Sequence, residues 1–537
     1  MPTECIPYKE TNYFSELILD YLAQKEKLKP FYKRFPEFEN FKAQIEEKTS
    51  FPVENREVLV QSLKQQYAET KVSSATSKNI DKLSQKTTFT VVTGHQLNLF
   101  TGPLYFLYKI VSTINLTKLL KEKYPEYDFV PVYWMATEDH DFEEISFFNL
   151  HGKKFKWVNA EESAGRDAVG NLSTNGLEEV YKLFSAEIGG GKNADYLRNL
   201  FDKAYLQHEN LTDATRYLAN ELFKEQGLVI LDGQGKDLKK LFIPYAQREL
   251  TEQLSYKTTL PKTEALNDLG YQVQVNPREI NLFYLHNELR ERIIEREDRY
   301  FVHDTEIEWS RDEIIRELED YPERFSPNVM LRPLYQEVIL PNLCYIGGGG
   351  ELAYWLELKD YFEAEKVPFP VLLLRNSALI QHEKINEKRE KLNISLKELF
   401  LKPHELINRK VRQISNIDID FSPQKEHLVK QFQHLYELAE QTDKTFLNAV
   451  KAQEVKQLKG LENLEKRLLK AQKRKLEDHV HRIAELQNEL FPNQSLQERH
   501  ANFSELYAEY GEDLISTLLK ELNPLEAEFK ILTFGKK

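Results

Sequence analysis

Four ionisable residues stand side by side in the first third of the chain. Glu138, Asp139, His140 and Asp141 come directly after the apolar run at 129–136. A histidine beside carboxylates can act as a general base near neutral pH, and the same groups can bind a divalent metal ion. Adjacent residues of an extended segment point to alternate sides, so all four cannot reach one atom. We predict that these residues are catalytic, although acid–base chemistry, metal binding and a simple solvated loop all remain open.

A second polar group, Thr93-Gly94-His95-Gln96, follows the apolar pair at 91–92. A glycine at this point lets the backbone approach a ligand closely, and the helix that follows can offer free N–H groups to an anion. We predict that Gly94, His95 and Gln96 contact a substrate, together with Lys109 of that helix. The alternative is an ordinary loop that ends in a helix cap.

Glycines fill residues 347–350 and are followed by Glu351. Four glycines cost backbone entropy, which close approach to a ligand would explain, although a flexible connection is the alternative. The run lacks the spacing and the terminal lysine of a phosphate-binding P-loop. We predict that Gly348, Gly350 and Glu351 contact the substrate.

Three further residues have side chains suited to a carboxylate. Arg332 and Gln336 lie in the segment LRPLYQ, and Arg375 follows an apolar run at 369–374. A guanidinium group binds a carboxylate through charge-assisted hydrogen bonds. We include the three among the substrate-binding candidates, while each could instead anchor the fold.

The elements around these residues indicate an α/β fold. Residues 88–92 and 129–136 are predicted strands, and a helix that opens near Gly102 joins them. A strand–helix–strand unit implies parallel pairing with a right-handed connection. Ligands of open α/β sheets bind outside the carboxyl ends of the strands. We therefore expect the loops at Gly94 and Asp139 to line one small-molecule cleft.

The chain divides into several predicted regions. Beyond about residue 380 strand patterns disappear and apolar residues recur at a and d spacing, which is typical of a coiled coil. Inside the core we expect strands at 271–275 and 281–286, with a charged stretch after them. The expected regions are a helical region and linker at 1–85, a Rossmann-like core at 86–380 with insertions at about 150–225 and 235–340, a helical coiled-coil domain at 381–500, and a C-terminal helical segment at 501–537 that packs on the core.

The composition limits the class of protein. A net charge of −13 argues against a protein whose main task is to bind nucleic acid. Cys5 and Cys344 are the only cysteines, so we expect a reducing cytoplasm and no disulfide framework. No apolar run approaches the roughly 20 residues that span a bilayer, and we expect no membrane partner.

Five separated motifs together resemble one family. They are VVTGHQLNLFTGPLYFLYKI, PVYWMATEDHDFEEI, NVMLRPLYQEVILPNL, IGGGGELAYWLELK and FPNQSLQER. In this order they resemble the cysteine-adding enzymes of bacillithiol synthesis, the BshC family, from about residue 10 to the C-terminus. Relatives often carry GQQ where this chain has Gly94-His95-Gln96, so Gln96 is a better candidate than His95. Many also have a proline where this chain has Gly349.

The resemblance implies a Rossmann-like core with connecting-peptide insertions and a coiled coil that pairs two protomers as a homodimer. It implies a ligase that joins cysteine to glucosaminyl-malate through an amide bond. It also implies an adenine nucleotide, ATP or ADP with Mg²⁺, near the C-terminal helices, where Arg499 and Asn502 are candidate contacts. Two other readings stay open: a nucleotidyltransferase or metal-dependent hydrolase on the same core, and a non-catalytic coiled-coil partner protein.

Overall fold

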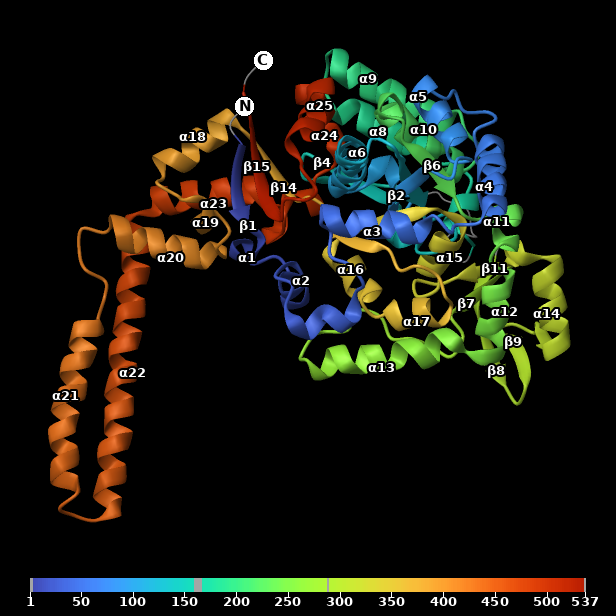
Figure 1. The fold of residues 1–537 in the computed structure, drawn as a ribbon. Coiled ribbons are helices and arrows are strands. Elements are labelled where there is room, and N and C mark those ends of the chain that lie inside the picture. Colours follow the sequence, from blue (N-terminus) through green and yellow to red (C-terminus); the bar gives the residue numbers. More distant parts are fainter. Residues whose placement is uncertain (1–2, 159–166, 287–288, 536–537) are drawn as a thin grey trace.

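A five-stranded parallel sheet runs through the main body of the molecule in this computed structural model, which describes residues 3–158, 167–286 and 289–535 (Figure 1). Its strand order is β13-β12-β2-β3-β6, and every neighbouring pair is parallel. The strands are β2 (Thr88–His95), β3 (Asp128–Met135), β6 (Val229–Asp232), β12 (Asn342–Gly347) and β13 (Val371–Leu374). The predicted α/β fold with parallel pairing of the first two strands is confirmed.

The sheet is buried on both faces. All eight residues of β2 are buried, as a continuous apolar strand requires when helices and loops cover both sides. Alternate side chains enter two hydrophobic clusters: Val92 joins the larger one, while Phe89 and Val91 pack with Phe41 of helix α3 (Phe38–Lys48). Helix α6 (Tyr105–Lys123) links β2 to β3 and packs on both.

The connections of the sheet reverse direction between β2 and β12. From β2 the chain moves outward to β3 and β6, and it later returns on the other side of β2 to form β12 and β13. Such a switch point leaves a crevice at the carboxyl ends of the two inner strands. Gly94 in β2 and Gly347 at the end of β12 both lie at this edge.

Two insertions extend the core. The first carries the hairpin β4 (Phe147–Leu150) and β5 (Lys153–Lys156), followed by helices α8 (Leu177–Glu187), α9 (Lys192–Phe201) and α10 (Leu211–Phe223); residues 159–166 of this insertion lie outside the described residues. The second carries helices α11 (Lys236–Lys240), α12 (Ile243–Glu252), α13 (Leu254–Asp268) and α14 (Arg311–Asp320) and an antiparallel sheet in the order β10-β9-β8-β7-β11. The strands of that sheet are β7 (Leu282–His286), β8 (Leu289–Arg296), β9 (Arg299–Val302), β10 (Glu308–Ser310) and β11 (Phe325–Pro327).

The second insertion differs from prediction in two places. Residues 271–275 form no strand, because no described strand pairs with their backbone. The Tyr271 hydroxyl instead donates a 2.6 Å hydrogen bond to Asp20 of helix α2 (Glu16–Leu22). The charged stretch after β7 is instead the strand β8, which pairs with β7 and β9 and keeps most of its charged residues only partly buried.

The two ends of the chain form a third sheet. Its order is β1 (Thr3–Pro7), β15 (Glu528–Phe534) and β14 (Ala378–His382), and the termini lie close together in Figure 1. The C-terminal segment predicted as helical does contain α24 (Phe503–Tyr510) and α25 (Glu512–Glu521), but it ends in a strand. Strand β15 forms because its apolar residues are buried between two pairing partners.

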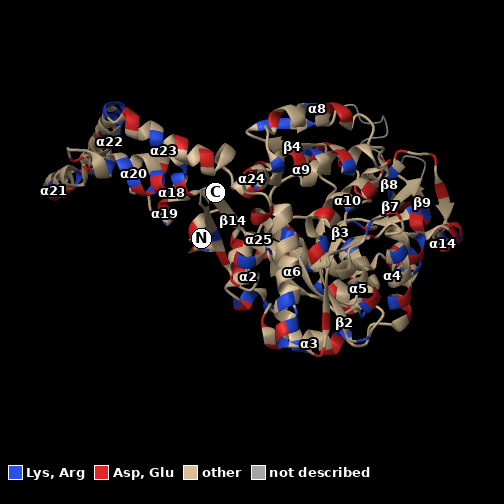
Figure 2. Ribbon diagram, turned by 90° about the horizontal axis from the view of Figure 1, so that it is seen from above, with Lys and Arg blue, Asp and Glu red and all other residues tan. Residues whose placement is uncertain are grey.

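A long helical arm leaves the main body. Helices α21 (Ser422–Ala439) and α22 (Lys444–Lys475) run side by side, and α23 (Glu477–Leu490) returns the chain towards the core (Figure 1). Figure 2 shows Lys, Arg, Asp and Glu distributed over both the arm and the main body. Within the described residues, no helix is long and apolar enough to cross a membrane. The predicted coiled coil is confirmed.

Candidate active site

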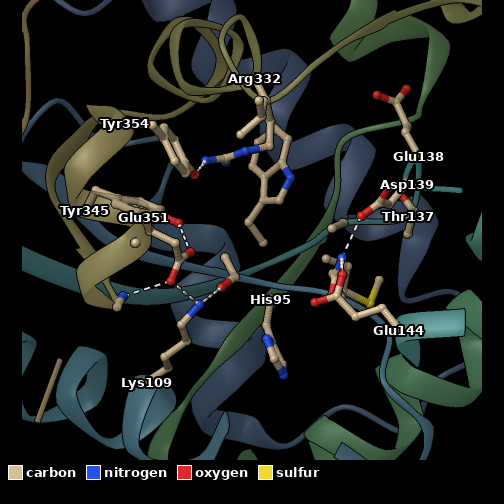
Figure 3. A pocket seen from close by; sticks show the side chains of 18 of the residues that line it. His95, Lys109, Thr137, Glu138, Asp139, Glu144, Arg332, Tyr345, Glu351 and Tyr354 are labelled. Carbon is tan, nitrogen blue, oxygen red and sulfur yellow. Dashed lines mark hydrogen bonds and ion pairs between the residues drawn. The ribbon is translucent and has the colours of Figure 1, made fainter. Parts of the chain in front are cut away.

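A cavity of about 420 Å³ opens at the switch point of the parallel sheet (Figure 3). It is bounded by the ends of β2 and β3 and by the glycine turn after β12. Gly94 and Asp139 both line it, so the two loops share one cleft as expected. Four arginines also reach its wall: Arg290, Arg332, Arg375 and Arg499.

A buried ion pair closes one side of the cavity. Lys109 of α6 lies 2.6 Å from Glu351, and its ammonium group also donates a 2.6 Å hydrogen bond to the Gly94 carbonyl. Glu351 stands in the first turn of α16 (Gly349–Trp355), where it accepts hydrogen bonds from the Tyr345 hydroxyl at 2.6 Å and the Gly348 amide at 2.8 Å. Burial acts to raise the pKa of Glu351, but Lys109 and these donors lower it on balance. Glu351 is therefore an ionised anchor for Lys109.

Arg332, the first residue of helix α15 (Arg332–Ile339), lies on another side of the cavity. Its guanidinium donates to Gln336 Oε1 at 3.1 Å and to the Tyr354 hydroxyl at 3.4 Å, and it lies 5.8 Å from the centre of the Trp134 ring. No carboxylate of the described residues forms an ion pair with it. A guanidinium group in this setting is suited to a carboxylate or phosphate of a ligand.

Gln336 does not contact the cavity as predicted. Its side chain is fully buried beneath Arg332 and does not line the wall. It faces inward because it lies one helical turn after Arg332, where an i, i+4 contact forms. Gln336 therefore supports a ligand-facing residue.

Gln96 joins the two strand ends. Its amide donates to Asp139 at 2.8 Å and to Glu144 at 2.9 Å, and all three residues line the cavity. Burial acts to raise the pKa of Asp139, but hydrogen bonds from His140 and Gln96 and the charge of Arg290 lower it well below its usual range. Asp139 is therefore ionised and a weak proton acceptor.

The four residues of the Glu138–Asp141 run have different surroundings. Glu138 lines the cavity but pairs with the buried Lys239 at 2.5 Å and accepts a hydrogen bond from Ser326 at 3.1 Å. Lys239 was not predicted, because it stands in the second insertion without a recognisable motif.

His140 and Asp141 do not line the cavity. The Arg290 guanidinium donates to His140 Nδ1 at 2.9 Å, which requires this nitrogen to be an acceptor. Asp141 is exposed and caps the short helix α7 (Phe142–Ile145) by accepting from the Glu144 amide at 3.1 Å. Successive side chains diverge as the segment turns, so only the first two of the four face the cavity.

His95 is a packed residue. Its ring centre lies 5.5 Å from that of Tyr105 and 5.1 Å from that of Phe106, and Figure 3 shows the side chain pointing away from the Lys109–Glu351 pair. Burial and the nearby charge of Lys109 lower the pKa of His95 to about 3, so its imidazole is neutral at physiological pH. His95 lines part of the cavity, as Gln96 does. Its neutral, packed ring makes it the weaker candidate for binding a ligand, whereas the Gln96 amide joins Asp139 and Glu144.

The remaining candidates lie where the C-terminal region meets the core. Arg375 lines the cavity and forms a buried ion pair with Glu498 at 2.8 Å. Arg499 is exposed at the cavity rim, and the described part of the chain gives its guanidinium no hydrogen-bond or ion-pair partner. Arg499 can therefore receive an anion.

Asn502 does not fit its predicted role. Its amide donates to the carbonyls of Phe100 and Gly102, both at 2.7 Å, and its oxygen accepts from Ser504. The side chain is fully buried, so no group is left for a nucleotide. It stabilises a turn in which Phe100 and Gly102 both have positive φ angles, at 49° and 60°.

Three other wall residues carried no sequence signal. Arg290 comes from a strand that reads as a charged stretch, while Tyr345 and Tyr354 read as apolar core positions. Across residues 3–158, 167–286 and 289–535, no group of three or more His, Cys, Asp or Glu side chains converges as metal ligands do.

Comparison with known proteins gives a consistent result over the whole chain. The family described as "Bacillithiol biosynthesis BshC, N-terminal Rossmann-like domain" matches residues 1–376, and "Bacillithiol biosynthesis BshC, C-terminal coiled-coil domain" matches residues 378–534. A protein of Christiangramia forsetii named "Putative cysteine ligase BshC" is 70% identical over 538 residues, which cover 100% of both chains. Proteins of the same name are 60% identical in Flavobacterium johnsoniae, over 99% of this chain and 100% of the relative, and 37% identical in Cytophaga hutchinsonii, over 97% of each.

Proposed function

The chain belongs to the BshC family of bacillithiol biosynthesis, and we propose that this ligase forms an amide bond between cysteine and glucosaminyl-malate. One observation carries the proposal: Arg332, which has no acidic partner among the residues that the structure describes, faces a cavity of small-molecule size at the switch point of the sheet. Glucosaminyl-malate carries carboxylates, which a guanidinium binds in a fixed orientation.

The cavity walls have complementary roles in the proposed reaction. Arg332 binds a malate carboxylate, and Asp139 and Glu144 lie across the cavity, where they can attract an amine. Holding both reactants in one site replaces a slow bimolecular encounter with a local reaction. The Lys109–Glu351 pair fixes the backbone at Gly94 and Gly348, so the cavity keeps its shape.

The attacking amine must lose a proton when the amide forms. His140 and Asp141 lie outside the cavity, and the lowered pKa of Asp139 makes it a weak acceptor. Glu144 lines the cavity 2.9 Å from the Gln96 amide. We assign proton acceptance to Glu144 in this proposal.

The nucleotide part of the proposal depends on Arg499 and the glycine turn. Arg499 and Gly348 to Gly350 would hold the phosphates of an adenine nucleotide with its Mg²⁺, whereas Asn502 has no free group to contribute. When bound, the nucleotide would supply the energy for activating the cysteine carboxylate.

Two further parts of the proposal concern the whole protein. A homodimer through the arm is supported by apolar side chains that α22 leaves exposed, including Val455 and Leu464. A reducing cytoplasm is supported by Cys5 and Cys344, which are both free thiols.

The proposed reaction can be tested with purified protein, cysteine and glucosaminyl-malate, with and without ATP and Mg²⁺. We expect mass spectrometry to detect the thiol product in which both substrates are joined. Nucleotidyl transfer or hydrolysis without ligation would favour the alternative enzyme classes. If folded protein ligates under none of these conditions, the proposal is contradicted and a partner-protein role is favoured.

A further inference from the structure

A continuous row of buried side chains links Arg332 to the N-terminal helix α3. Arg332 donates to Gln336 at 3.1 Å, and the Gln336 amide donates to Glu337 Oε1 at 3.1 Å. Glu337 Oε2 accepts from Lys48, the last residue of α3, at 2.8 Å. Asn342 of β12 donates to Glu337 Oε1 at 2.6 Å.

The members of this row are unusually well buried. Gln336 and Asn342 are fully buried, and Lys48 and Glu337 are each 1% exposed. Burying a lysine and a glutamate is costly unless they are paired and hydrogen-bonded. None of the four lines the cavity, so the predicted ligand contacts do not account for this pair.

Glu337 determines which way the Gln336 amide faces. Burial raises the pKa of Glu337, while the Lys48 ammonium group 2.8 Å away favours its ionised form. A side-chain amide has a donor end and an acceptor end, and a carboxylate paired with Lys48 accepts hydrogen bonds. The NH₂ group of Gln336 must therefore face Glu337, which leaves its oxygen towards Arg332. Among the described residues, the Arg332 guanidinium donates to two side-chain acceptors, this oxygen and the Tyr354 hydroxyl. These two contacts orient the guanidinium.

We propose that Glu337, held by Lys48, is a positioning residue that acts through Gln336 to aim the Arg332 guanidinium into the cavity. This rests on the proposed function for the identity of the ligand, a carboxylate of glucosaminyl-malate. Helix α3 therefore contributes to substrate binding, although none of its residues lines the cavity.

Two variants interrupt the row at different points. In Gln336→Met, the Lys48–Glu337 pair remains, but Arg332 loses the Gln336 oxygen and keeps only the Tyr354 hydroxyl as an acceptor. In Glu337→Gln, the new oxygen faces Lys48 and the new NH₂ faces the NH₂ groups of both Gln336 and Asn342. We expect Gln336 to turn and to present its own NH₂ to Arg332. We expect each variant to raise KM for glucosaminyl-malate about tenfold while kcat changes less than twofold, since a hydrogen bond to a charged group is lost.

Glu398→Gln is the matched control. Glu398 forms a buried pair with Lys410 at 2.8 Å in the helical region, far along the chain from Arg332. The same loss of a buried charge there is expected to leave KM unchanged. If Glu337→Gln does not fold, Gln336→Met decides the question, because it leaves no buried charge without its partner.

Crystal structures separate this inference from the proposed function. We expect Arg332 to contact Gln336 in wild type and to leave that position in Gln336→Met. If wild type does not ligate but Arg332 moves in the variant, the function fails and the positioning role stands. If wild type ligates, and KM and the Arg332 orientation are unchanged in both folded variants, the inference is overturned and the function stands.

Discussion

The core of this protein buries charged side chains, whereas its arm exposes apolar ones. In the core, Lys48 pairs with Glu337 away from the cavity wall, and Lys109 pairs with Glu351 on one side of the cavity. In the arm, Val455 is 57% exposed and Leu464 is 53% exposed. Buried charges are rarely kept unless paired, and large apolar side chains left exposed on a helix are available for contact with a partner. The difference is consistent with the proposal that the core orients ligand-binding groups and the arm takes part in assembly.

The largest effect is expected from Arg332→Ala, which removes the guanidinium at the centre of the core's polar network. We expect kcat/KM for glucosaminyl-malate to fall by roughly 10²–10³, because truncating one member of a charged hydrogen-bonded pair costs about 2–5 kcal/mol. Steady-state ligation kinetics measure the change. Arg332→Lys keeps the positive charge but lacks the planar guanidinium that binds a carboxylate through two hydrogen bonds. It should therefore recover only part of the lost kcat/KM. Unchanged kinetics in Arg332→Ala would contradict the view that the polar network of the core orients a ligand-binding arginine.

Lys109→Met tests whether the buried charges depend on each other. The substitution leaves Glu351 without its ion-pair partner, and we expect a loss of about 3–5 kcal/mol in the free energy of unfolding. Denaturant titration followed by circular dichroism measures it. The double variant Lys109→Met/Glu351→Gln should regain part of that stability. A single variant as stable as wild type would mean that the pair is not needed to hold the Gly94 and Gly348 backbone.

Much of the core could be predicted because its signals are local. The apolar strands at 88–92 and 129–136, joined by one helix, imply parallel pairing, so Gly94 and Asp139 had to share an edge. The pairing of β1 with β15 could not be predicted in this way, because it joins residues more than 500 positions apart.

The orientation of the Glu138–Asp141 run could not be predicted either. It depends on Lys239 and Arg290, two residues of the second insertion that belong to no motif. In the arm, the apolar spacing predicts the helices but not which residues stay exposed: Phe432 is buried, while Val429 is 42% exposed. Local periodicity does not reveal how two helices rotate against each other.

A smaller, pH-dependent effect is expected at Glu357, a buried carboxyl group of the core for which the described part of the chain supplies no ion-pair partner. Burial raises its pKa to about 7, and the Thr263 hydroxyl donates to it at 2.6 Å. A carboxyl group with a raised pKa in the folded state stabilises the fold below its unfolded pKa of about 4.5 and loses that contribution as pH rises through 7. Glu357→Gln should therefore be more stable than wild type by about 1–3 kcal/mol at pH 8 and equal to it near pH 4. Equal melting temperatures at pH 8 would contradict this.

In the arm, Val455→Glu and Leu464→Glu should change assembly and leave the chemistry intact. A glutamate at either position opposes the burial of that part of α22 in a dimer. We expect sedimentation analysis to show a shift towards monomer, with ligation rates within about twofold of wild type because no arm helix lines the cavity. A large loss of ligation in a folded variant would contradict the view that the arm takes no part in the chemistry.

The smallest effects are expected from His140→Ala and Asp141→Asn, at positions first predicted to be catalytic. Asp141 caps a helix and is exposed, so ligation should stay near the wild-type rate. His140 contacts Arg290 on the cavity wall, and we expect a reduction of a few fold at most. Ligation assays at equal folded fraction measure both. A loss of a hundredfold or more in either variant would restore the catalytic prediction.

The most direct test is a crystal structure of the protein with glucosaminyl-malate bound. The account predicts that the ligand lies in the cavity at the ends of β2, β3 and β12, with a malate carboxylate within hydrogen-bonding distance of the Arg332 guanidinium. A ligand bound elsewhere, or one whose carboxylates do not reach Arg332, would contradict it.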